Sequence, residues 1–133
     1  MEYRGKQIVA IEIWAEGYYS SSFAGHVGFM FKEDYEKYED IVNEFSTWFH
    51  ELDGKHSEIE GTIDVHYNDE DIVKAVARQT DDYKFYENVL EHIAEEVEEE
   101  ETNRIEQISQ EIAEQFNVKT VVEVSFNNKT YTV

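Results

Sequence analysis

One stretch of the chain, Ser57 to Tyr67, alternates apolar and polar side chains with a period of two. This is the period of a β-strand, in which successive side chains point to opposite faces of a sheet. The apolar positions would face a core: Ile59, Ile63, Val65 and Tyr67. The polar positions would face water: Glu58, Glu60, Thr62, Asp64 and His66. The pattern therefore predicts an antiparallel sheet that is covered on one face and solvated on the other.

Two more strands are indicated near the N-terminus. The segment from Gln7 to Trp14 is rich in β-branched residues and indicates a largely buried strand, in which Glu12 is the exception. A second strand is indicated from His26 to Phe31. Since Glu16 to Gly25 reads as a serine-rich loop bounded by glycine, we expect the two strands to pair as a hairpin.

The C-terminal segment, 118–133, predicts another hairpin. Two β-rich runs flank the pair Asn127-Asn128. Asparagine tolerates a positive φ, which the tight turns of hairpins require. We expect these last strands to return and lie beside the first ones.

A long helix is predicted from Lys32 to Leu52. Its apolar residues recur at spacings of three and four and would form one buried stripe: Tyr38, Ile41, Val42, Phe45, Trp48, Phe49 and Leu52. Glu33 and Asp34 lie in its first turn, where the helix dipole favours acidic side chains. Gly54 is placed to end the helix.

Three further helices are expected in the second half of the chain. A short one runs from Glu70 to Arg78, after the capping residues Asn68 and Asp69. The apolar rhythm then indicates one helix over 81–101 and another over 104–116. Asn103 followed by Glu106 has the spacing of a capping box at the start of the last helix, whose apolar face would consist of Ile105, Ile108, Ile112 and Phe116.

These elements follow one another in the order ββαβαααββ. This order predicts a two-layer α+β fold, with an antiparallel-dominated sheet of about five strands and about four helices on one face. No proline is present, and no Gly- or Ser-rich linker divides the chain. We therefore expect a single domain over residues 1–133.

Negative charge is concentrated in the segment from Glu87 to Glu101. Eight of its fifteen residues are glutamate: Glu87, Glu91, Glu95, Glu96, Glu98, Glu99, Glu100 and Glu101. On a helix they would place about one charge per 2.6 Å of axis, compared with about one per 1.7 Å along duplex DNA. An apolar stripe at spacings of three and four would bury the opposite side of this helix: Tyr83, Tyr86, Leu90, Ile93 and Val97.

This arrangement is expected to cost free energy. Glutamates four residues apart on a helix repel one another by about 0.2–0.5 kcal/mol per pair. On the predicted helix, Glu98 to Glu101 would lie at the C-terminal end, where the helix dipole disfavours anions. Part of this cost is offset if Glu100 and Glu101 face the start of the next helix. Because local conflicts of this kind are expected at functional sites, we interpret the run as a surface for a basic partner, with simple solubilisation as the alternative.

The overall charge points the same way. The chain has 31 acidic and 11 basic residues and a formal net charge of −20. Such a surface repels nucleic acid and anionic membranes, so we expect no direct binding to either. The absence of cysteine excludes disulfides. The N-terminus lacks the pattern of a signal peptide and no apolar run is long enough to cross a bilayer, so we expect a soluble, cytoplasmic protein.

A metal site and an enzyme active site are the weaker alternatives. Glu58, Glu60, Asp64 and His66 share one strand face that could hold a divalent cation, but an ordinary solvated face explains them as well. Ser20, Ser21 and Ser22 precede His26 without the strand–turn–helix context of a catalytic nucleophile. We therefore expect no metal, no cofactor and no enzymatic activity.

In charge and size the chain is similar to the small acidic proteins of phages and mobile elements that mimic nucleic acid. It is also similar to acidic immunity proteins that block basic toxins. The resemblance implies a non-enzymatic inhibitor that docks on a basic surface of a nucleic-acid-binding protein or nuclease. The expected partner-binding residues are the eight glutamates above together with Glu58, Glu60 and Asp64.

The alternative hypothesis is a small-ligand-binding or sequestering domain. Aromatic rings beside hydroxyl residues form adaptable binding loops, and the loop over 16–26 combines both. Its candidate ligand-binding residues are Tyr18, Tyr19, Ser20, Ser21, Ser22 and His26. Whether the chain forms a homodimer is left open by the sequence.

Overall fold

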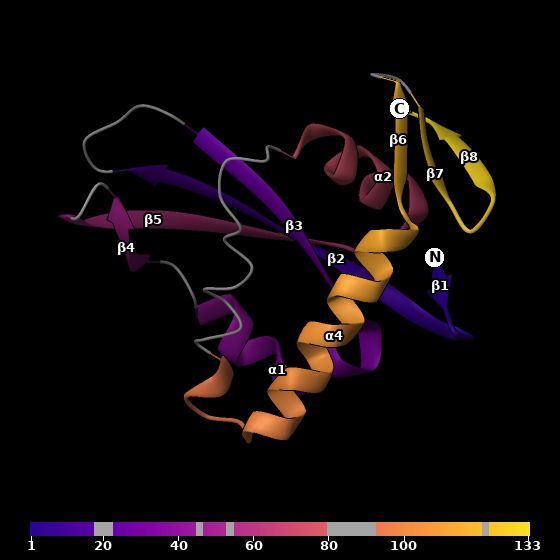
Figure 1. The fold of residues 1–133 in the computed structure, drawn as a ribbon. Coiled ribbons are helices and arrows are strands. Elements are labelled where there is room, and N and C mark those ends of the chain that lie inside the picture. The colour runs from indigo at the N-terminus through magenta and orange to yellow at the C-terminus, as the bar shows by residue number, and fades with distance from the viewer. Residues whose placement is uncertain (18–22, 45–46, 53–54, 80–92, 121–122) are drawn as a thin grey trace.

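The computed structural model describes residues 1–17, 23–44, 47–52, 55–79, 93–120 and 123–133. Within these ranges the chain forms an α+β fold with two antiparallel sheets and three helices. Figure 1 shows how these elements are arranged. The strands of the larger sheet are β1 (Glu2–Tyr3), β2 (Lys6–Gly17), β3 (Phe23–Phe31), β4 (Thr47–Leu52) and β5 (Lys55–His66). The helices are α1 (Lys32–Glu44), α2 (Asp69–Arg78) and α4 (Glu99–Gln115). The smaller sheet contains β6 (Asn117–Thr120), β7 (Glu123–Phe126) and β8 (Lys129–Thr132).

Strand β2 is the centre of the larger sheet. It pairs antiparallel with β3 on one side, in a register that places Ala10 opposite Phe29. On the other side it pairs with β5, in a register that places Glu12 opposite Asp64. The predicted hairpin of the first two long strands and the strand over 57–67 are therefore confirmed.

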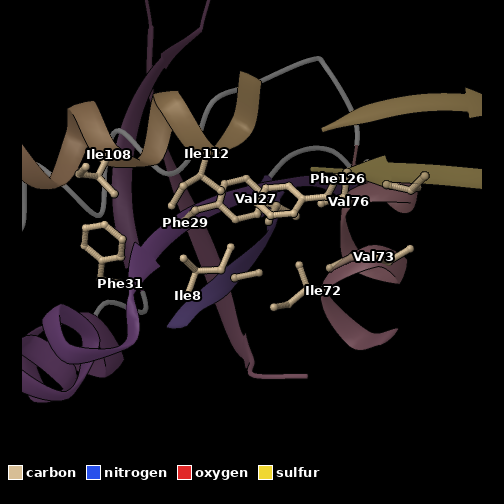
Figure 2. Packing of buried hydrophobic residues seen from close by; sticks show 13 residues of the cluster. Ile8, Val27, Phe29, Phe31, Ile72, Val73, Val76, Ile108, Ile112 and Phe126 are labelled. Carbon is tan, nitrogen blue, oxygen red and sulfur yellow. The ribbon is translucent and has the colours of Figure 1, made fainter. Parts of the chain in front are cut away.

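Both faces of β2 are buried, because its apolar residues are consecutive and not alternating. Odd-numbered residues enter a cluster with α1, whose main members are Val9, Ile11, Ile13, Met30, Tyr35, Tyr38, Val42, Ile93 and Ile105. Even-numbered residues enter a second cluster with α2, the C-terminal half of α4 and β7. The second cluster is shown in Figure 2 and includes Ile8, Phe29, Ile72, Val76, Ile108, Ile112 and Phe126.

The expected placement of all helices on one face is thus wrong. Helix α1 covers one face of the sheet and α2 covers the other. The alternation in β5 holds only for its own residues: Ile63 and Val65 pack on the α1 side, whereas Asp64 is exposed. The alternation of apolar and polar residues in β5 describes only the two faces of that strand. The neighbouring β2 has a continuous apolar run, which buries both of its faces.

Side chains cover the outer edge of β3. The backbone amide of Phe29 donates a hydrogen bond to Oγ of Ser109 on α4, at 3.0 Å. The amide of Val27 donates to Oε1 of Gln79, the residue after α2, at 3.3 Å. These bonds satisfy N–H groups that an edge strand would otherwise present to other chains.

The C-terminal strands form a separate sheet in the order β6-β7-β8. Asn127 and Asn128 have φ values of 49° and 65°, so the predicted hairpin turn is confirmed. The expected return of these strands to the first ones is not found among the described strands. Instead, Val124 and Phe126 of β7 pack onto the α2 side of the larger sheet.

The helix predicted over 32–52 ends at Glu44, and Thr47–Leu52 forms strand β4. Strand β4 pairs antiparallel with β5 in a register that places Leu52 opposite Lys55. The residue expected to end this helix, Gly54, lies outside the described residues. The apolar spacing of 38–52 fits a helix, but pairing with the free edge of β5 decides the structure of its second half.

The predicted start of the last helix is also wrong. Helix α4 begins at Glu99, and its N-cap is Glu98, which makes no side-chain capping bond. Asn103 lies inside the helix, so it forms no capping box with Glu106. By contrast, Asn68 caps α2 as predicted, since its Oδ1 accepts a hydrogen bond from the backbone amide of Asp71 at 2.9 Å.

None of the described helices is long and apolar enough to cross a membrane.

Candidate acidic interface

The acidic run reaches the described part of the chain at the start of α4. Glu99, Glu100 and Glu101 form its first turn, directly after the N-cap Glu98. Ile93 and Ala94 are still helical, and a turn follows in which the amide of Val97 donates to the carbonyl of Ile93 at 3.0 Å. The described part of the helix predicted over 81–101 therefore consists of two helical residues, a turn and the start of a new helix.

This placement reverses the expected effect of the helix dipole. The N-terminal end of a helix carries a partial positive charge, which stabilises anionic side chains in the first turn. The four glutamates from Glu98 to Glu101 thus lie at a favourable end of α4 and not at an unfavourable one. The prediction that this part of the run is held at a cost in free energy was wrong.

Arg104 ties this end of α4 to α1. Its guanidinium donates to both carboxylate oxygens of the buried Asp34, at 2.9 and 2.8 Å, and to Glu101 at 2.6 Å. The hydroxyl of Tyr38 also donates to Glu101, at 3.1 Å. Hydrogen bonding to Arg104 lowers the pKa of Glu101, and the two carboxylates together raise the pKa of Arg104. Glu101 is therefore a structural residue of the α1–α4 contact.

The remaining glutamates of this surface are directed to solvent. Their side chains are all exposed: Glu95, Glu96, Glu98, Glu99 and Glu100. Within the described ranges, Glu96, Glu98, Glu99 and Glu100 form no ion pair. We refer to Glu98, Glu99 and Glu100 as the α4 acidic turn.

The sheet face predicted as a second acidic surface lies elsewhere. Asp64 is exposed and lies opposite Glu12 in the register, on the face that α2 covers. The α4 acidic turn adjoins α1, which covers the other face. The structure therefore does not bring Asp64 and the α4 acidic turn together.

Glu12, which lies opposite Asp64, belongs to a buried charge cluster that the sequence does not predict. Glu12 is 2% exposed, and its carboxylate accepts hydrogen bonds from Arg78 at 2.6 Å and from Nε2 of His66 at 2.9 Å. The only sequence signal was a charged residue in an apolar strand, because its main partner lies 66 residues away. Both oxygens of Glu12 are engaged, so this cluster holds α2 on the sheet.

Other predicted residues lie outside the description. Glu87, Glu91 and the loop residues Tyr18, Tyr19, Ser20, Ser21 and Ser22 fall in ranges that the structure does not describe. Of Glu58 and Glu60 only the backbone is described, in β5, where Glu60 lies opposite Thr47. His26 lies half-buried on β3, opposite Ile13 of β2.

The described residues contain no group of three or more His, Asp or Glu side chains arranged to hold a metal ion. Comparison with protein-family models, with curated protein sequences and with solved structures finds no match. Conclusions about function therefore rest on the residues themselves.

Proposed function

We propose that the protein is a non-enzymatic binding protein, and that its α4 acidic turn docks on a basic surface of a nucleic-acid-binding protein or nuclease. The observation that carries this proposal is the exposure of Glu98, Glu99 and Glu100 side by side at a fixed helix end, with no cation paired to them in the described ranges. A partner that supplies the missing cations would gain charge-assisted hydrogen bonds there.

The turn is attached to a rigid part of the fold. Arg104 and Glu101 fix the first turn of α4 against α1, and Ile105 of the same helix is buried in the cluster that α1 covers. An interface held in place by its scaffold loses little conformational entropy when a partner binds. This pre-organisation supports the proposal in place of the energetic frustration that the sequence suggested.

The charge of the whole chain favours encounter with a basic partner. A net charge of −20 attracts a cationic surface over a distance of about one Debye length, roughly 8 Å at physiological salt. Complementary fields increase the association rate and orient the two molecules, more than they increase affinity. Binding of this kind should weaken steeply as salt is raised.

A charge-matched pair of variants tests the proposal. Glu98→Gln, Glu99→Gln and Glu100→Gln together remove the α4 acidic turn. Glu106→Gln, Glu114→Gln and Glu123→Gln remove the same charge from the rest of α4 and from β7. Each protein is immobilised at low salt and exposed to a lysate freed of nucleic acid, and the captured proteins are released with duplex DNA.

We expect the unmodified protein and the control variant to capture basic nucleic-acid-binding proteins that duplex DNA displaces. The variant of the α4 acidic turn should capture at least tenfold less. Equal loss in both variants would mean that only net charge matters, and the proposed site would be wrong. Capture that duplex DNA does not displace would contradict competition for a nucleic-acid site.

A further inference from the structure

A cavity of about 500 Å³ lies where helix α4 ends and the smaller sheet begins. Its lining comes from the last residue of α4, from strands β6, β7 and β8, and from the turn between β7 and β8. Figure 1 shows this sheet at the end of α4 that lies opposite the α4 acidic turn. Small-molecule sites in proteins usually enclose about 300–1,000 Å³, so the cavity has the size of such a site.

The strands place a row of polar side chains along the cavity. Asn117 of β6 lies opposite Ser125 of β7, and Ser125 lies opposite Thr130 of β8. Because residues opposite each other in an antiparallel sheet share a face, these side chains form one row across the sheet. The neighbours of Ser125 along β7, Val124 and Phe126, belong to the buried cluster, which fixes the direction of Ser125 toward the cavity.

Carboxamide side chains dominate the lining. The cavity is lined by four of the chain's twelve Asn and Gln residues: Gln115, Asn117, Asn127 and Asn128. Although 31 of the 133 residues are acidic, none of the described residues of the lining is. Lys119 is the one charged residue among them. The cavity therefore differs in its chemistry from the acidic surface of the rest of the chain.

Several of these polar groups have hydrogen-bonding capacity left for a ligand. Within the residues that the structure describes, the side-chain amides of Gln115, Asn117 and Asn128 form no hydrogen bond. Ser125 is only 8% exposed, and its hydroxyl donates a long bond, at 3.4 Å, to the backbone carbonyl of Asn117. Both lone pairs of this hydroxyl stay unused by the described residues, so it can accept from a ligand.

The charges around the cavity decide which ligand fits it. A cation would meet Lys119 and no carboxylate among the described lining residues. An anion would have to approach a chain with a net charge of −20 and would find a single lysine. An apolar ligand would find little apolar surface, because Phe126 is 2% exposed. A neutral ligand with many hydrogen-bonding groups fits the lining best.

We infer that the cavity binds a neutral saccharide. Each carboxamide donates through its NH₂ group and accepts through its oxygen. The hydroxyls of a sugar also donate and accept, so two adjacent hydroxyls can pair with both ends of one carboxamide. Because the ring of Phe126 is buried and offers no face for stacking, we expect weak binding in the millimolar range.

This site is independent of the α4 acidic turn. Glu99 and Gln115 are the first and last residues of α4 and lie sixteen residues apart. At a rise of about 1.5 Å per residue, the two ends of the helix are roughly 24 Å apart. A small ligand at one end therefore leaves the other end free for a basic protein.

NMR titration of the whole chain tests the inference, with sucrose, maltose, trehalose and lactose as probes. At least one of these sugars should shift the backbone amides of Asn117, Ser125 and Thr130 along a saturable curve. The amides of the α4 acidic turn should not move. Inorganic phosphate and spermidine serve as charged probes and should cause no saturable shift at the cavity.

Variants show whether the lining itself holds the sugar. Ser125→Ala and Asn117→Ala should each weaken binding about three- to tenfold, as expected for the loss of one hydrogen bond. Asn128→Gly should do the same, and glycine retains the positive φ of this turn residue. Gln107→Ala removes an exposed carboxamide of α4 that does not line the cavity, so this control should bind the sugar like the unmodified protein.

The absence of a saturable shift with all four sugars would overturn the inference. A saturable response at the cavity to phosphate or spermidine alone would also overturn it, because the ligand would then be charged. Equal affinity in Ser125→Ala, Asn128→Gly and the unmodified protein would place the sugar elsewhere and have the same consequence. Capture of basic proteins is measured separately, so its failure would contradict the proposed function and leave this site standing.

Discussion

Arg78 donates hydrogen bonds to both carboxylate oxygens of Glu12, although 66 residues separate the two in the chain. Glu12 lies on the central strand β2 and Arg78 is the last residue of α2. The forked contact at 2.6 Å therefore holds the C-terminal end of α2 on the sheet. His66 on β5 also hydrogen-bonds to this carboxylate, through its Nε2 at 2.9 Å.

Arg78→Leu should destabilise the protein, because it leaves the buried carboxylate of Glu12 without its main partner. Removing one member of a buried pair costs about 3–5 kcal/mol, and the partial exposure of Arg78 places the expected loss near the lower value. Urea denaturation measures it. The double variant Glu12→Leu, Arg78→Leu should recover part of the loss, and failure to do so would show that the arginine acts through packing and not through the charge.

The same carboxylate should make stability depend on pH. Burial alone would raise the pKa of Glu12, but hydrogen bonds from Arg78 and His66 lower it below its ordinary value. A carboxylate with a lowered folded-state pKa contributes stability above its unfolded pKa and loses it as pH falls through the folded value. Glu101 and Asp69 have lowered pKa values as well, through Arg104 and through the N-terminal ammonium group.

We therefore expect the stability difference between the unmodified protein and Arg78→Leu to be largest near pH 7 and to shrink below about pH 4.5. Urea denaturation of both proteins between pH 7 and pH 3 checks this. Taking the difference cancels the general relief of charge repulsion on acidification, which affects both proteins equally. A difference that stays constant down to pH 3 would contradict the role of Glu12.

Arg104→Met should loosen the contact between α4 and α1. The substitution leaves Asp34, whose side chain is 9% exposed, without its cation. The expected cost is about 2–3 kcal/mol, less than for a fully buried pair because Arg104 is 41% exposed. Lys74→Met is the matched control: it removes an exposed pair with Glu70 and should hardly change the melting temperature.

Asn128 should tolerate glycine but not a β-branched residue. Its φ of 65° lies in the left-handed region, where valine is strained by about 1–3 kcal/mol. Asn128→Gly should leave the melting temperature unchanged or raise it, whereas Asn128→Val should lower it. Thr130→Val, on the exposed strand β8 of the same hairpin, should have little effect. Equal effects of the two valine variants would show that backbone strain is not the cause.

Features set by neighbouring residues were predictable from the sequence. The paired strands β2 and β3, the cap at Asn68 and the turn at Asn127-Asn128 each depend on local backbone preferences, and the structure has all of them. The start of α4 was predictable as well. Acidic residues in the first turn indicate a helix start, and Glu99 to Glu101 carry this signal in α4 as Glu33 and Asp34 do in α1.

Features set by distant partners were not predictable. Trp48 and Leu52 fit a helical stripe, but their segment forms strand β4, because it pairs with β5. Glu12 was visible as an exception in an apolar strand, whereas its pairing with Arg78 requires the packing of α2. For the same reason, the separation of Asp64 from the α4 acidic turn by the whole sheet could be learned only from the fold.

Helix α4 belongs to both buried clusters. Ile105 packs on the α1 side of the sheet, whereas Ile108 and Ile112 pack on the α2 side. Neither half of the interior can open without exposing part of this one helix, so the two halves should melt as a single cooperative unit. The amides of Ile105 and Ile112 should accordingly exchange with deuterium at similar rates, and both should be among the slowest in the protein.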